Sequence, residues 1–208
     1  VLRVPDGMDL SRAAPILCAG ITTYSPLRTF GVKEGSRVGV IGLGGLGHMA
    51  VQLAVAMGAE VTVLSRSKKK EADAKELGAK GILASTDEEA MKAAASSFDV
   101  IIDTVPVKHN VDVYSPLLDI DGTLAIVGQV GKMEEFMSAA LIMGRRRVAG
   151  SLIGGIKETQ EVLDFCAEHD IYPICEMITP EQLNDAYAVM EKGDIAHRYV
   201  MDMSGVSV

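Results

Sequence analysis

The sequence predicts an α/β fold: a doubly wound parallel sheet of six strands, followed by a short C-terminal strand-helix-strand return segment. Two observations carry this prediction. Short apolar runs rich in β-branched residues alternate with segments of helical periodicity through the middle of the chain, which is the pattern of right-handed βαβ units. The runs are apolar nearly throughout, as expected for strands that helices cover on both faces.

Five clear strands and one weaker strand are expected, with helices between them. The strands are predicted at 37–42, 59–65, 98–104, 122–128 and 146–154, and the weaker one at 81–83. The helices are predicted near 45–57, 68–77, 87–96, 110–118, 135–143 and 157–168. In the first of these helices the apolar residues repeat at the spacing of one buried face, at Leu46, Met49, Ala50, Leu53, Ala54 and Met57.

The two ends of the chain differ from the middle. Residues 1–34, which contain several prolines, predict an incoming segment with one short helix. Near the other end, the run "YPICEMIT" precedes a helix that Thr179 would cap, with Gln182 completing a capping box. We expect Gly193 to end this helix and the run "HRYVMDM" to form a closing strand.

Composition and charge exclude several classes of protein. The net charge of −8 argues against nucleic acid as a partner, because phosphate binding needs a broad basic surface. The apolar runs stop well short of the roughly 20 residues that span a bilayer, and no leader precedes a cleavage site. Cys18, Cys166 and Cys175 have no metal-ligand spacing and predict reduced thiols. We therefore expect a cytoplasmic protein without a membrane partner and, since the chain begins with Val1, a fragment or a processed product.

The pattern Gly42-x-Gly44-x-x-Gly47 follows a predicted strand and precedes an amphipathic helix, the context of a dinucleotide-binding turn. Gly42 would permit the tight turn, Gly44 would let main-chain N–H groups approach a pyrophosphate, and Gly47 would let helix and strand pack closely. The helix N-terminus would add partial positive charge. The alternative is a glycine-rich turn without a ligand, which would leave the conformational cost of these glycines unexplained.

The residues after the second predicted strand favour NADP over NAD. An NAD site usually carries Asp or Glu there, whereas this chain has Ser65. A carboxylate would repel a 2′-phosphate by about 1 kcal/mol in water and about 4 kcal/mol near a protein surface. Ser65 and Ser67 can donate hydrogen bonds, and Arg66 with one lysine of 68–70 can neutralise the dianion. The lysines taken alone would also suit the solvated start of a helix.

These motifs together resemble the zinc-dependent medium-chain alcohol dehydrogenases, and within them the cinnamyl-alcohol-dehydrogenase-like branch. The resemblance rests on "LCAGITTYSPL" and "GLGGLGHMA", continues through "SFDVIIDTV", "DGTLAIVG" and "IAHRYVMDM", and covers essentially the whole chain. It implies a Rossmann fold, NADP as cofactor and a catalytic zinc. The implied reaction is the reduction of aldehydes to alcohols and the reverse oxidation.

The resemblance also implies roles for single residues. Cys18 would be a ligand of the catalytic zinc, Thr22 would lie near the nicotinamide as a catalytic residue, and Arg198 would reach the cofactor phosphates from the C-terminal segment. In many relatives serine stands at the position of Arg66, so its phosphate contact is inferred from its charge. The other cofactor-binding positions follow the predicted strands: Gly42, Leu43, Gly44, Gly45, Leu46 and Gly47; Ser65, Arg66, Ser67 and Lys70; Thr104 and Val105; Val127, Gly128, Ser151 and Ile153.

The resemblance begins in the middle of the family's chain, so the N-terminal catalytic domain, which supplies the other zinc ligands, has no counterpart here. It implies an incoming segment at 1–16, an NADP-binding domain at 17–156, and a crossover helix with the return segment at 157–208. A catalytic zinc normally has three protein ligands. We therefore expect Cys18 to be a buried thiol without metal and this chain alone to be inactive.

Two alternatives remain open. One is a zinc-free member similar to the quinone reductases, against which Cys18 within "LCAGITTY" counts. The other is a stand-alone nucleotide-sensing module without catalysis, which the missing domain keeps open.

The sixth strand predicts a homodimer. In the family that this chain resembles, this strand pairs with its twin across a two-fold axis, and "RRVAGSLIG" is apolar enough to do the same. An exposed strand edge carries unpaired N–H and C=O groups that a symmetric partner would satisfy. We expect residues 148–153 to lie near the axis.

Overall fold

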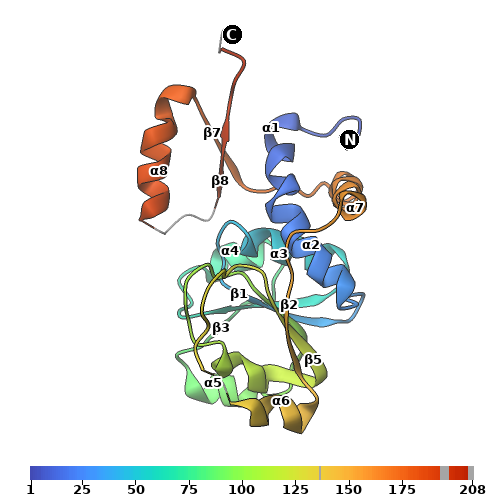
Figure 1. Cartoon of the computed structure of the whole chain (residues 1–208), viewed down its shortest axis with the longest axis vertical. Helices are drawn as coiled ribbons and strands as arrows, with labels where there is room; N and C mark the ends of the chain where they lie inside the picture. Colours follow the sequence, from blue (N-terminus) through green and yellow to red (C-terminus); the bar gives the residue numbers. More distant parts are fainter. Residues whose placement is uncertain (136, 193–196, 206–208) are drawn as a thin grey trace.

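A six-stranded parallel sheet forms the centre of the molecule (Figure 1). The computed structural model describes residues 1–135, 137–192 and 197–205. The strand order is β3-β2-β1-β4-β5-β6, and every neighbouring pair is parallel. The predicted doubly wound sheet is thus confirmed, with strands β1 Arg37–Ile41, β2 Glu60–Ser65, β3 Ile82–Ala84, β4 Phe98–Asp103, β5 Leu118–Ile126 and β6 Arg147–Gly150.

Helices cover both faces of this sheet. In β4 the side chains of Val100 and Ile102 pack into one apolar core, and Ile101 between them packs into the other. The helices that close the first core are α2 Ala19–Thr29, α3 Gly47–Ala56, α4 Glu71–Glu76 and α7 Ile156–Glu168. The second core is closed by α5 Glu88–Ala93 and the 3-10 helix η2 Asp112–Leu117. The helix α6 Ser138–Gly144 lies beside η2. No helix within the described residues is long and apolar enough to cross a membrane.

Several predicted elements were wrong in type or extent, among them the strand predicted at 146–154, which ends at Gly150. Within the segment 110–118, residues 112–117 form the 3-10 helix η2, because the ring of Pro116 would clash with the carbonyl four residues earlier in an α-helix. The helix predicted at 68–77 begins only at Glu71, so the lysines precede it and its first turn is acidic, as the helix dipole favours. β5 starts at Leu118, earlier than the predicted residue 122.

The incoming segment is more helical than expected. In place of one short helix it contains α1 Leu10–Ala13, the 3-10 helix η1 Ala14–Leu17 and the eleven-residue α2. Every residue of α2 from Ala19 to Leu27 is buried. Because Thr22, Thr23 and Ser25 are buried in this helix beside its apolar residues, it lacks the amphipathic stripe by which a sequence reveals a surface helix.

The C-terminal segment forms a separate two-stranded parallel sheet, joined by a helix as predicted (Figure 1). Its elements are β7 Cys175–Ile178, the 3-10 helix η3 Pro180–Gln182, α8 Leu183–Glu191 and β8 Arg198–Met201. The predicted capping pair is present, since the Thr179 N–H donates to Gln182 Oε1 at 2.9 Å. Gly193, the predicted helix stop, lies outside the described residues.

Arg37 ties three strands together at the amino end of the sheet. Its backbone N–H donates to Asp99 Oδ2 at 2.7 Å, and its guanidinium donates to Asp99 and, at 2.7 Å, to Asp119. Hydrogen bonds to Asp99 and then Asp119 raise the pKa of Arg37, and the bond from Arg37 lowers the pKa of the Asp119 carboxyl. Because Asp99 and Asp119 are each the second residue of their strands, these carboxylates lie at the end of the sheet opposite to the glycine turn.

β1 and α3 meet backbone against backbone. A Cβ atom on Gly47 would lie 2.1 Å from the carbonyl oxygen of Gly42, a distance that no real side chain tolerates. Gly42 itself has φ +85°, in the region that glycine adopts without strain. The predicted roles of these two glycines in the turn and in close packing agree with this geometry.

Replacing Gly47 with alanine tests this contact. Gly47→Ala should lower the free energy of unfolding by about 1–3 kcal/mol, because α3 must move away from β1 to make room for the methyl group. Gly131→Ala is the matched control, since a Cβ there would meet nothing within 4 Å, and it should change the free energy by less than about 0.5 kcal/mol. Urea unfolding curves measure both values. Equal stability of the two variants would contradict the close contact.

Candidate functional site

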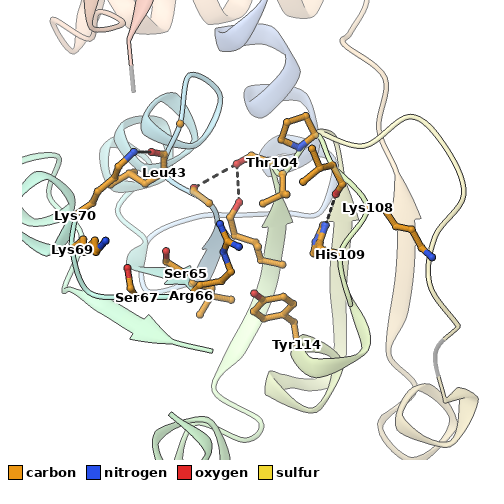
Figure 2. Close-up of a pocket in the computed structure, with 17 residues that line it drawn as sticks. Leu43, Ser65, Arg66, Ser67, Lys69, Lys70, Thr104, Lys108, His109 and Tyr114 are labelled. Carbon is orange, nitrogen blue, oxygen red and sulfur yellow. Dashed lines mark hydrogen bonds between the residues drawn. The ribbon is translucent and has the colours of Figure 1, made fainter. Parts of the chain in front are cut away.

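A cavity of about 540 Å³ opens at the carboxyl ends of β1, β2 and β4 (Figure 2). β1 and β4 are neighbours in the sheet, yet the segments that follow them pack into opposite cores. Such a reversal of winding leaves a crevice beyond the strand ends, which is where open α/β sheets bind ligands. The topology alone therefore places a candidate ligand site here.

The glycine turn forms one wall of the cavity. Gly42, Leu43 and Gly44 line it directly, and α3 begins immediately afterwards. The carbonyl of Leu43 accepts a hydrogen bond from Lys70 Nζ at 3.5 Å, which brings that ammonium group to the turn. A helix N-terminus and an adjacent cation favour an anionic ligand at this wall.

The end of β2 makes the cavity basic. Ser65, Arg66, Ser67 and Lys70 all line it, together with Lys69, which the sequence analysis did not single out (Figure 2). The lining residues described by the structure include four Arg or Lys side chains and no Asp or Glu. The cavity thus carries hydroxyl donors and cations without an acceptor-only carboxylate, a combination suited to phosphate.

The end of β4 completes the crevice. Thr104 Oγ1 donates to the carbonyl of Ile41 at 2.7 Å and so ties β4 to β1 beside the turn. Gly128, after β5, lies against this strand end, because a Cβ on Gly128 would be 2.3 Å from the carbonyl carbon of Thr104. Thr104 and Val105, both predicted site residues, line the cavity.

The structure adds lining residues that the sequence analysis missed. Pro106, Val107, Lys108 and His109 belong to the loop after β4, and Tyr114 belongs to η2. The available signal was their position after a strand at the reversal of winding, where loops surround the ligand site. Burial raises the pKa of Tyr114, so its hydroxyl keeps its proton as a hydrogen-bond donor.

A buried ionisable pair holds this loop against β4. His109 Nε2 lies 3.2 Å from Asp103 Oδ2, while His109 Nδ1 lies 2.9 Å from the carbonyl of Val107. A carbonyl can only accept, so Nδ1 carries a hydrogen. Burial raises the pKa of Asp103, and the opposing effect of His109 is smaller. The Asp103 carboxyl is therefore buried and lies beneath an imidazole.

The remaining predicted cofactor positions lie around the cavity and do not line it directly. Gly45, Leu46 and Gly47 continue the turn into α3. Val127, Gly128, Ser151 and Ile153 follow the carboxyl ends of β5 and β6, where the Ser151 N–H donates to the carbonyl of Ile126 at 3.1 Å. Thr22 is buried within α2.

Arg198 reaches the glycine turn from the C-terminal segment. A Cβ on Gly45 would lie 2.6 Å from Arg198 Cζ, so the guanidinium rests on the backbone of the turn. The structure thus brings together residues separated by more than 150 positions in the sequence.

Cys18 is exposed, so the expectation of a buried thiol was wrong. It lines a second hollow of about 370 Å³, formed by η1 and by the start of β8, including Arg198. Within the described part of the chain, no three His, Cys, Asp or Glu side chains lie close enough to hold a metal ion. The donor set around Cys18 therefore does not fit a zinc ion, and its role as a ligand stays a prediction.

Known proteins share both the sequence and the fold. Residues 45–168 match the protein family described as zinc-binding dehydrogenase. The chain is 51% identical over 204 residues to the probable formaldehyde dehydrogenase AdhA of Bacillus subtilis, covering 98% of this chain and 58% of that protein. It is 50% identical over 206 residues to the NADP-dependent alcohol dehydrogenase C 1 of Mycolicibacterium smegmatis, covering 99% and 59%. A solved cinnamyl alcohol dehydrogenase (SbCAD4) from Sorghum bicolor has a TM-score of 0.93 at 41% identity, over 99% of this chain and 59% of that chain.

These matches confirm the resemblance derived from the sequence motifs. The chain spans less than two thirds of the length of each of these relatives. The family match covers more than half of the chain, from Gly45 in the second half of the glycine turn to the end of α7. This chain therefore belongs to the zinc-binding dehydrogenase family.

Proposed function

We propose that this chain is the NADP(H)-binding part of a zinc-dependent alcohol dehydrogenase that interconverts primary alcohols and aldehydes of the cinnamyl type. One observation carries the proposal. A basic cavity at the reversal of winding combines a glycine turn with Ser65, Arg66 and Ser67 at the end of β2, and none of the described residues that line it is acidic. The names of two relatives, an NADP-dependent alcohol dehydrogenase and a cinnamyl alcohol dehydrogenase, support the same function.

Each wall of the cavity would hold one part of the cofactor. The turn from Gly42 to Gly47 would bind the pyrophosphate with its main-chain N–H groups, and Arg198 would add a cation. Thr104 and Val105 would border the adenosine. The 2′-phosphate would lie against Ser65, Arg66, Ser67 and Lys70, and the nicotinamide ribose and ring would lie near Val127, Gly128, Ser151 and Ile153, with Thr22 beside them.

The nicotinamide ring, when bound, would supply or accept the hydride that converts an aldehyde to an alcohol. This chain's own residues would bind and orient the cofactor. The resemblance to the family assigns Cys18 as one ligand of a zinc in the complete enzyme, and the other ligands would have to come from outside the described residues. In this proposal 1–16 and 157–208 connect the binding domain, 17–156, to the catalytic domain, and the complete enzyme is cytoplasmic.

Cofactor preference tests the proposal. NADP should bind this chain at least about tenfold more tightly than NAD, because one charge-assisted hydrogen bond contributes about 1.5–3 kcal/mol. Calorimetric titration with the two nucleotides measures the ratio. Equal affinities would refute the assignment of the 2′-phosphate site.

Two substitutions locate the preference. Arg66→Ala and Lys70→Ala should each weaken NADP binding about tenfold and leave NAD nearly unchanged. Lys157→Ala, which removes a charge on the exposed surface of α7, is the matched control and should change neither affinity. An equal loss for both nucleotides would assign these side chains to the pyrophosphate instead.

We also propose that the complete protein is a homodimer through β6. This strand is the last of the sheet, so one of its edges has no neighbour in the described fold. Large apolar side chains are exposed in the segments that precede and follow this strand in the chain, among them Met143, Leu152 and Ile153. An apolar edge strand favours pairing with another chain.

The register of β6 shows which of its backbone N–H groups face β5 and which face the free edge. The Ser151 N–H points to β5, since it donates to the carbonyl of Ile126. Backbone N–H groups alternate along a strand, so the N–H of Ala149 also faces β5 and that of Val148 faces outward. Proline is tolerated where the N–H points away from the sheet.

Light scattering should therefore give a dimer of the 22.1 kDa chain for the wild type and a monomer for Val148→Pro. Val148→Thr, which keeps the N–H and the branched shape, should remain dimeric. A monomeric wild type, or a Val148→Pro variant that is still a dimer, would rule this interface out.

Metal content and activity test how much of the enzyme this chain contains. The 208-residue chain by itself should contain no stoichiometric zinc after dialysis and should not reduce cinnamaldehyde with NADPH, because Cys18 alone cannot hold the ion. Elemental analysis and loss of NADPH absorbance are the measurements. One zinc per chain, or turnover above the rate without protein, would show ligands elsewhere in the chain.

A further inference from the structure

One buried histidine joins the glycine turn to the C-terminal segment. His48, in the first turn of α3, is 1% exposed. Its Nδ1 lies 3.1 Å from the carbonyl oxygen of Gly44, and its Nε2 accepts a hydrogen bond from the Ile174 N–H at 3.1 Å. A carbonyl can only accept and an amide N–H can only donate, so the ring is neutral and carries its hydrogen on Nδ1.

The surroundings keep the ring in this form. Burial lowers the pKa of His48 to about 4 and outweighs the opposing hydrogen bond with Gly44, and Arg198 adds a smaller effect in the same direction as burial. The imidazole is therefore neutral near pH 7, where a protonated ring could no longer accept from Ile174. Both hydrogen bonds can persist together under those conditions.

The connection continues from Ile174 to Arg198 and back to the turn. The carbonyl of Ile174 accepts the backbone N–H of Arg198 at 2.8 Å, just before β7 and at the first residue of β8. The Arg198 guanidinium then rests on Gly45, as its 2.6 Å distance from a Cβ built there shows. Gly44, His48, Ile174 and Arg198 thus form a closed path that begins and ends at the glycine turn.

We propose that His48 is a positioning residue: it fixes the C-terminal segment against the glycine turn, so that Arg198 and the turn bind the cofactor pyrophosphate as one site. The segment has a sheet of its own, and its described residues share no strand pairing with the six-stranded sheet. A long arginine side chain on such a segment needs its backbone held in place before its charge can face the phosphates. This inference rests on the proposed binding of NADP(H).

Three variants of the 208-residue chain test the link. His48→Leu removes both hydrogen bonds and should weaken NADP binding about tenfold by calorimetry. His48→Gln keeps a side-chain oxygen that can accept from Ile174 and should stay within about threefold of the wild type. Gln52→Leu is the matched control, because Gln52 also joins α3 to this segment, by a bond to the Tyr172 carbonyl at 3.3 Å, without contacting the turn. It should change the affinity less than about twofold.

A double-mutant cycle separates positioning from general destabilisation. If His48 acts through Arg198, adding His48→Leu to Arg198→Ala should cause no further loss of affinity beyond about twofold. Additive losses would overturn the inference, as would a His48→Leu variant that binds like the wild type while Arg198→Ala binds weakly. A wild-type chain that binds no NADP would instead refute the proposed function.

A spectroscopic measurement needs no variant. Nitrogen NMR of the wild-type chain at pH 7 should show His48 with Nδ1 protonated and Nε2 unprotonated, and the opposite tautomer would overturn the assignment.

Should His48→Leu fail to fold, His48→Asn takes its place in the cycle. Its shorter amide keeps a donor for Gly44 and does not reach Ile174, so the same losses are expected.

Discussion

The contact between Gly47 and the carbonyl of Gly42 is the constraint on which the site depends. No side chain fits between β1 and α3 at this point, so the helix starts directly beside the strand end, next to the turn residues that line the cavity. The same contact places His48, the next residue, within reach of both Gly44 and Ile174. The turn, the helix N-terminus and the attachment of the C-terminal segment therefore share one geometric origin.

The placement of the charged residues also makes the cavity basic. The chain carries a net charge of −8, yet the described residues that line the cavity include no carboxylate. Asp99 and Asp119 pair with Arg37 at the far end of the sheet, and Asp103 is buried beneath His109. Local arrangement, and not net charge, sets the sign of the field that an anionic ligand meets.

The sequence by itself determined the features that depend on neighbours in the chain. Alternation of β-branched runs with helical periodicity predicted the parallel sheet, and the spacing of Gly42, Gly44 and Gly47 predicted the turn, because strand, turn and helix there are consecutive. Ser65 was found by its offset from the glycines. Where local signals conflict, prediction was less accurate: proline makes 110–118 a 3-10 helix, and buried α2 shows no amphipathic stripe.

Tertiary structure alone decided what depends on the docking of distant segments. It placed Arg198 over Gly45 and Ile174 beside His48, and it brought His109 and Tyr114 to the lining of the cavity. It also exposed Cys18, whose type suggested burial. These outcomes could not be derived from spacing, because contacts across more than a hundred residues are set by how whole elements pack. The sequence specifies that packing only through the sum of many weak apolar contacts.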